Sequence, residues 1–308
     1  MQTDTNKSLN AAGTLNVGTT LERRLPVGAE VLREGGVNFR VWAPKCNSVE
    51  VVFEQEAGLS NGATITTVSL HRNEQGYFAG TAENAHAGIL YRFRLDSGEM
   101  LLPDPGSRYQ PDGPHGPSMI VDPAQYRWND HDWPGVHLHG QVLYEMHIGT
   151  YTSEGTWRAA MNQLEELARM GITVLEIMPV NEFPGRFGWG YDGVNLFAPT
   201  RLYGEPDDFR RFIDRAHNLG LGVILDVVYN HLGPDGNFLN CFSDDYFTDR
   251  HETDWGDALN FDDKNSGPVR EFFISNAGYW IDEYHLDGLR LDATDCIFDA
   301  SPRHVLAD

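Results

Sequence analysis

The sequence predicts two folded units, an all-β sandwich followed by the first four strands of a (β/α)8 barrel. Residues 27–122 contain short segments in which apolar and polar residues alternate, as they do in strands with one buried face. From Gln141 onward the pattern changes to strand, helix, strand, helix. A chain of 308 residues is long enough to bury the cores of two such units.

In the first unit, alternation and turn residues define five strands. They are expected at 37–41, 49–53, 64–70, 77–81 and 90–95. Short strands at this spacing are typical of a small sandwich. We expect the proline-rich residues 102–122 to connect the units. Residues 1–26 are polar and lack an apolar signal core, so we expect a disordered tail and a cytoplasmic protein.

The second unit, residues 123–308, alternates β-branched strands with amphipathic helices. We expect strands at 142–148, 173–178, 223–229 and 288–292. One helix has its apolar face at 160–168 and stops at Gly171, a second opens at Pro206 and stops before Gly220, and a third spans 269–281. Four such units predict a parallel sheet and half of a (β/α)8 barrel.

Two connections are longer than a turn requires. They span 181–203 and 230–267, and both carry many aromatic residues, among them Trp189, Tyr191 and Trp255. Both follow strand C-terminal ends, where barrels of this kind build their sites. The rings could therefore contact a ligand, or they could pack the loops themselves.

Polar side chains mark the ends of the third and fourth strands. Asp226 and His231 belong to the run 223–231, and Arg290 and Asp292 belong to 288–294. Alternation puts Arg290 and Asp292 on one face, where the guanidinium favours the ionised carboxylate and suits it to act as a nucleophile. A lone aspartate at a strand end is often only a helix cap or an ion pair. Two strands with matching polar ends favour a shared catalytic pocket.

These two runs resemble the signatures of a known enzyme group. Residues 226–231 resemble the Asp-x-x-x-Asn-His signature of the α-amylase superfamily of glycoside hydrolases, and 288–292 resemble its Gly-x-Arg-x-Asp nucleophile strand. The resemblance implies that the sandwich is an immunoglobulin-like module. It also implies a retaining mechanism with Asp292 as the nucleophile, kept charged by Arg290.

The resemblance implies further roles around the pocket. Asn230 and His231 are expected to order the pocket and hold a sugar hydroxyl, while Tyr191 stacks on the sugar being cleaved, with Trp189 beside it. Asp226 is expected to support Arg290 or His231 rather than transfer a proton. His147, at the end of the first strand, is a weaker candidate for substrate contact, and a structural role is equally open.

Four stretches narrow the resemblance to the branch that cleaves the α-1,4 bond joining trehalose to a maltooligosaccharide. They are 103–111 with 115–117, 144–150, 188–193, and 292–294 with 303–306. Where many amylases have a lysine or histidine shortly after the nucleophile, this chain has Asp295 and Cys296. We expect maltooligosyltrehalose or another α-glucan as the substrate. Glycogen branching and glucan binding without catalysis remain alternatives.

Composition excludes several classes of partner. The formal net charge of -22 opposes a nucleic-acid backbone, and no apolar run is long enough to span a membrane. Three scattered cysteines do not make a disulfide scaffold. We expect no metal and no cofactor.

The resemblance places the general acid on the fifth strand, whereas the sequence stops at Asp308, after the fourth. We therefore expect a family member cut in half. Taken alone, such a polypeptide would be inactive and would have two unpaired sheet edges.

Overall fold

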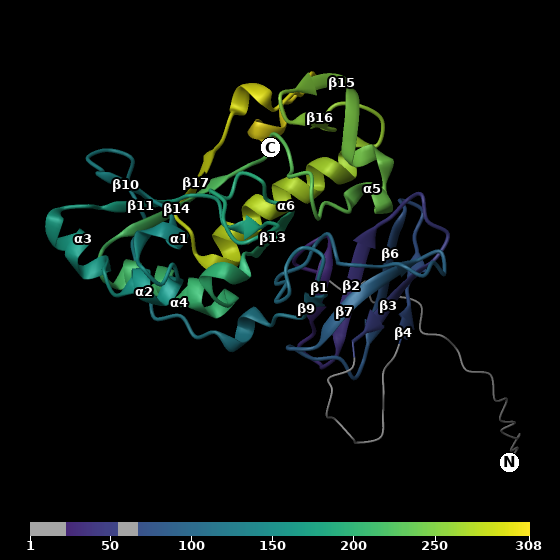
Figure 1. The fold of residues 1–308 in the computed structure, drawn as a ribbon, viewed down its shortest axis with the longest axis horizontal. Coiled ribbons are helices and arrows are strands. Elements are labelled where there is room, and N and C mark those ends of the chain that lie inside the picture. The colour runs from purple at the N-terminus through teal and green to yellow at the C-terminus, as the bar shows by residue number, and fades with distance from the viewer. Residues whose placement is uncertain (1–22, 55–66) are drawn as a thin grey trace, which may run out of the picture.

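The computed structural model describes residues 23–54 and 67–308, which form two packed units (Figure 1). Residues 1–22 of the expected tail and the start of the expected strand 64–70 lie outside the described residues.

The first unit is a sandwich of two antiparallel sheets. One sheet has the order β1-β2-β6-β5, and the other has the order β4-β3-β7-β8, with β9 pairing to β7. The strands are β1 (Gly28–Val31), β2 (Val37–Trp42), β3 (Val49–Phe53), β4 (Thr67–Ser69), β5 (His71–Arg72), β6 (Tyr77–Ala82), β7 (Leu90–Leu95), β8 (Leu101–Leu102) and β9 (Ser118–Met119). Alternating side chains such as Val37, Phe39 and Val41 are fully buried between the sheets. The predicted β-sandwich is confirmed.

The second unit is built on a parallel sheet with the order β10-β11-β14-β17. Its strands are β10 (Leu143–Met146), β11 (Val174–Ile177), β14 (Gly222–Val227) and β17 (Gly288–Leu291). The predicted parallel sheet of alternating β/α units is confirmed. Within the described residues this sheet is open and does not close into a barrel.

Six helices and several 3-10 turns accompany the strands of the described chain. The helices are α1 (Ile148–Tyr151), α2 (Trp157–Met161), α3 (Leu164–Met170), α4 (Pro206–Asn218), α5 (Leu239–Phe242) and α6 (Ser266–Tyr284). The 3-10 turns are η1 (Pro123–Gln125), η2 (Arg201–Tyr203), η3 (Asp244–Tyr246), η4 (Thr294–Cys296) and η5 (Val305–Ala307).

Two expected elements differ from the structure. The helix expected over 160–168 is broken into α2 and α3, because the amide of Asn162 closes α2 on the carbonyls of Ala159 and Ala160. The first strand is shorter than 142–148, since α1 begins at Ile148. Gly171 ends α3 as predicted, with φ of 92° in the left-handed region that favours glycine.

Both long connections contain structure of their own. The connection 181–203 holds the antiparallel pair β12 (Asn181–Glu182) and β13 (Asn195–Pro199). The connection 230–267 holds α5 and the hairpin of β15 (Phe247–Thr253) and β16 (Gly256–Leu259). Pairing within each loop satisfies backbone hydrogen bonds that a loose loop of this length would leave to water.

The sandwich packs directly against the second unit. Phe242 of α5 is buried in the sandwich core and meets Phe93 edge to face, with ring centroids 6.1 Å apart. Trp42 of β2 meets Tyr246 of η3 in the same manner at 5.1 Å. The loop after β14 is therefore anchored on the sandwich.

No helix in the described part of the chain combines the length and the apolar character needed to cross a membrane. Cys46, Cys241 and Cys296 carry free thiols.

Candidate active site

The ends of β14 and β17 bring two carboxylates to one guanidinium. Asp226 and Arg290 are register partners on these neighbouring strands. Nη1 of Arg290 donates to Oδ1 and Oδ2 of Asp226 at 2.9 and 3.0 Å and to Oδ1 of Asp292 at 2.8 Å. Asp292 continues the ladder through its amide, which bonds to Val227 O at 3.0 Å. Ala293 then turns the chain with φ of 39°, a conformation that is costly for a residue with a side chain.

The two carboxylates differ in access. The side chain of Asp226 is 1% exposed, whereas that of Asp292 is 20% exposed. Burial raises the pKa of Asp226, and hydrogen bonds from Arg290 and Tyr191 oppose that shift. Hydrogen bonds to Asp292 and Asp226 raise the pKa of Arg290, so the guanidinium stays charged. Asp292 is therefore the carboxylate that can reach a bound molecule, and Asp226 supports the guanidinium.

Asn230 and His231 lie next to Asp292 and order its surroundings. Nδ2 of Asn230 donates to the backbone oxygen of Asp292 at 2.9 Å and to its Oδ2 at 3.3 Å. Oδ1 of Asn230 contacts Nδ1 of His231, which fixes the orientation of the amide. His231 is buried, and burial lowers the pKa of its imidazole. The Asp292 carboxylate is thus held by Arg290 of β17 and by Asn230 of the loop that follows β14.

The loop after β11 brings an aromatic residue to the same cluster. The hydroxyl of Tyr191 donates to Oδ2 of Asp226 at 2.9 Å. Gly190, with φ of 95°, allows the loop to pass close to the end of β11, because a Cβ there would lie 2.0 Å from Pro179 O. Trp189 is 73% exposed, so its ring is open to solvent above the loop.

His147 supports that loop from beneath. Its Nε2 contacts Gly188 O at 2.9 Å and the hydroxyl of Tyr203 at 3.0 Å, and its Nδ1 contacts Oγ1 of Thr150 at 3.1 Å. These contacts join the end of β10 to the residue before Trp189. Both ring nitrogens of His147 therefore have hydrogen-bond partners within the protein, which agrees with the structural role that the sequence left open.

Comparison with known proteins identifies the family. Residues 122–268 match the catalytic domain of alpha amylase, and residues 26–123 match carbohydrate-binding module 48, the isoamylase N-terminal domain. The malto-oligosyltrehalose trehalohydrolase of Saccharolobus solfataricus is 45% identical over 277 residues, which is 90% of this chain and 47% of that protein. This chain belongs to the α-amylase family. The family prediction is confirmed, as is the narrower resemblance to the trehalohydrolases.

A second curated relative and a solved structure are also similar to this chain. The malto-oligosyltrehalose trehalohydrolase of Deinococcus radiodurans is 40% identical over 94% of this chain and 46% of its own length. A crystal structure of a putative alpha amylase from Salmonella typhimurium has a TM-score of 0.84 and 44% identity, covering 92% of this chain and 46% of that one. The chain spans about half the length of the curated relatives it matches.

Two residues beside this cluster were not singled out from the sequence, which named Trp255 only as one of several loop aromatics and did not name Glu176. Trp255, at the turn of the β15–β16 hairpin, stacks on His231 with centroids 4.8 Å apart and is 48% exposed. Glu176 of β11 pairs in register with Ile224 and so shares the sheet face of Asp226. Burial, Glu145 and Asp226 raise its pKa. An acid between Leu175 and Ile177 in an apolar strand is a signal that could have identified Glu176.

Proposed function

We propose that the protein is a retaining glycoside hydrolase that cleaves the α-1,4-glucosidic bond of maltooligosyltrehalose and releases trehalose. The observation that carries the proposal is the Asp292 carboxylate, which is accessible and bound by Arg290 and Asn230 at the end of β17. Support for the substrate comes from the names of the relatives, which are trehalohydrolases at 40 to 45% identity.

In this mechanism Asp292 attacks the anomeric carbon from one face of the sugar. A carboxylic acid about 5 Å away protonates the departing oxygen, and water then releases the covalent glycosyl intermediate. Arg290 orients the Asp292 carboxylate through its 2.8 Å hydrogen bond. Asp226 is not proposed as the acid, because its oxygens accept hydrogen bonds from Arg290 and Tyr191 and it is buried.

The remaining side chains are proposed to bind the sugar. Asn230 and His231 would hold hydroxyl groups as positive charge develops at the anomeric carbon. Tyr191 would offer its ring face while its hydroxyl stays on Asp226, and Trp189 would stack on a sugar farther along the chain. His147 would act on substrate only indirectly, by holding Gly188.

We further propose that β10, β11, β14 and β17 are the first half of a (β/α)8 barrel and that the sandwich is an immunoglobulin-like module. The domain boundary would lie at 122/123. The parallel order of the sheet and the limits of the two family matches support this assignment.

The test uses the protein expressed from its complete gene and maltooligosyltrehalose as substrate. Trehalose should be released, and the newly formed reducing end should retain the α configuration in a proton NMR time course. New α-1,6 branches on amylose without trehalose release would assign a branching enzyme instead. Glucan binding with no turnover would assign a binding protein and overturn the proposal.

A further inference from the structure

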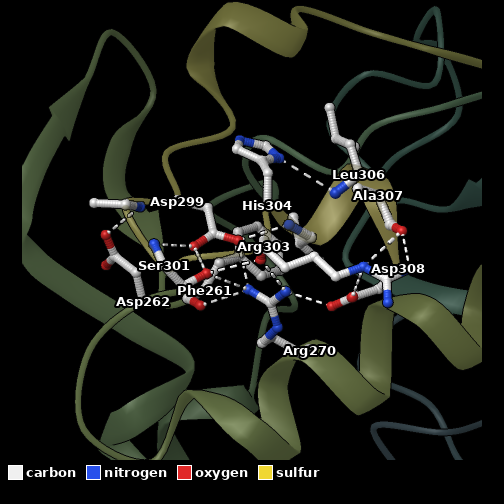
Figure 2. A network of polar contacts seen from close by, with 12 residues as sticks. Phe261, Asp262, Arg270, Asp299, Ser301, Arg303, His304, Leu306, Ala307 and Asp308 are labelled. Carbon is white, nitrogen blue, oxygen red and sulfur yellow. Dashed lines mark hydrogen bonds and ion pairs between the residues drawn. The ribbon is translucent and has the colours of Figure 1, made fainter.

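A single arginine on α6 joins two chain segments that border the site. The guanidinium of Arg270 lies among carbonyl and carboxylate oxygens on the side of α6 that faces the end of the chain (Figure 2). Its side chain is 16% exposed. Its hydrogen-bond acceptors are Phe261 O, Asp299 Oδ2, Ser301 Oγ, Arg303 O and Asp308 Oδ2.

Phe261 lies before α6, at the end of the loop that follows β14, whereas the other acceptors lie after β17. One planar guanidinium therefore fixes the distance and angle between these segments, which a point charge could not do as well. Burial opposes ionisation of Asp299, but hydrogen bonds from Ser301, Arg270 and the Val305 amide outweigh it and lower the pKa of Asp299 to about 2. The ion pair is thus charged at neutral pH.

A second set of contacts adds the β15–β16 hairpin to the same assembly. Oδ2 of Asp262 accepts the Ala300 amide at 2.8 Å, and its Oδ1 accepts Nη1 of Arg250 at 3.3 Å. The ring of His251 stacks on Phe298 with centroids 4.8 Å apart. The hairpin, the residues before α6 and segment 297–308 are consequently held as one wall.

This wall is continuous with the catalytic residues. Segment 297–308 follows Asp292 after the short turn η4, and the turn of the hairpin carries Trp255, which stacks on His231. Trp255 is 48% exposed, so its ring is accessible to a glucan that extends beyond a sugar bound at Asp292.

We propose that Arg270 is a positioning residue that holds this wall in place so that the site can bind the parts of a glucan beyond the sugar at Asp292. The inference rests on the proposed glycosidase function. It does not require that the substrate end in trehalose.

The experiment compares long and short substrates in the complete protein. In Arg270→Met, kcat/KM for maltooligosyltrehalose should fall about tenfold or more, mainly through a higher KM, because a displaced wall misplaces the chain. Hydrolysis of α-glucosyl fluoride, which needs only the sugar site at Asp292, should stay within about twofold. The inhibition constant of maltoheptaose against glucosyl fluoride hydrolysis should rise in parallel with KM.

Arg270→Lys keeps the charge but offers fewer hydrogen-bond donors. Its kcat/KM for maltooligosyltrehalose should lie between those of the wild type and Arg270→Met. Asp299→Asn weakens the same ion pair by changing the partner of Arg270. This variant replaces Arg270→Met in the experiment if Arg270→Met does not fold. The control is Arg210→Lys, a buried arginine of α4 that bonds to Glu283 at 3.1 Å. This variant should lower the melting temperature. It should not change the ratio of kcat/KM for maltooligosyltrehalose to kcat/KM for α-glucosyl fluoride.

Equal losses on glucosyl fluoride and on the long substrate would show that Arg270 acts on Asp292 or on folding, and would overturn the inference. Unchanged maltoheptaose inhibition would also overturn it. Failure of the wild-type protein to release trehalose would overturn the proposed function alone, because the fluoride and maltoheptaose measurements still test Arg270.

Discussion

Strands β14 and β17 carry a cluster of polar side chains at each end, and in both clusters two aspartates share one basic side chain. At the C-terminal ends Asp226, Arg290 and Asp292 meet. At the N-terminal ends lies Asp287, just before β17. Its carboxylate accepts a hydrogen bond from the backbone amide of Val223 and forms another with His217 of α4. Nε2 of His217 bonds to Asp287 at 3.1 Å, and its Nδ1 bonds to Asp130 at 3.0 Å.

The clusters differ in what covers them. Trp133 stacks on His217 with centroids 4.8 Å apart and donates its indole N–H to Asp287 at 2.7 Å. The side chain of His217 has no exposed surface. At the other end, Arg290 is 42% exposed and no ring closes over Asp292 among the described aromatic contacts. The closed cluster can only hold elements together, while the open one can meet a substrate.

Asp292→Asn should give the largest effect, since it removes the charge of the proposed nucleophile with almost no change in volume. We expect kcat to fall on the order of 10⁴-fold or more. The melting temperature should stay near that of the wild type. Assays with maltooligosyltrehalose measure the first quantity and calorimetry measures the second. Retention of more than about a tenth of wild-type activity would exclude Asp292 as the nucleophile.

Asp287→Ala should produce the opposite pattern. It leaves buried His217 and the Val223 amide without their partner, so the free energy of unfolding should fall by about 3–5 kcal/mol. The kcat of the folded fraction should be unchanged. Urea unfolding provides the measurement, and Asp282→Ala, an exposed aspartate of α6, is the matched control. A loss of kcat at full stability would reveal a catalytic role for the closed cluster.

Tyr191→Phe removes the hydrogen bond from the hydroxyl to Asp226 and should lower kcat/KM about tenfold. Because that bond lowers the pKa of Asp226, its loss should raise the pKa further. The acid limb of the pH profile of kcat/KM should then move to higher pH. An unshifted acid limb would mean that Asp226 does not titrate in the profile.

The smallest effect concerns the pH dependence of stability. Burial lowers the pKa of His217, but hydrogen bonds to Asp287 and Asp130 outweigh it and raise the pKa above 6.5. The stabilisation is therefore complete below pH 6.5 and is lost as pH rises through the folded-state pKa. Unfolding free energies between pH 6 and 9 should fall with a slope of at most about 1.4 kcal/mol per pH unit. Asp287→Ala should flatten this slope; a slope unchanged in that variant would contradict the assignment.

The sequence predicted the open cluster better than the closed one. Residues 226–231 and 288–292 are contiguous runs in which alternation fixes the facing side chains. Asp130, His217 and Asp287 lie far apart in the chain and share no spacing that would join them. Only the tertiary fold brings them together.

The sequence did not predict local structure correctly where the repeat of apolar residues along a strand or helix does not match the actual element. The register of β15 and β16 shifts between Thr248 and Glu252, so the hairpin lacks the strict alternation that reveals a strand. The break between α2 and α3 likewise interrupts a helical pattern that continues across it. The stacking of Trp255 on His231 depends on that unrecognised hairpin, which explains why the sequence treated Trp255 as one loop aromatic among several.

Phe242 limits how the sandwich could be exchanged. It belongs to the unit that carries the proposed nucleophile, yet its ring packs in the core of the sandwich. A graft of these catalytic strands onto another sandwich would expose Phe242 and release the loop that carries His231. The loop that carries His231 therefore depends for its anchorage on a sandwich whose core has room for Phe242.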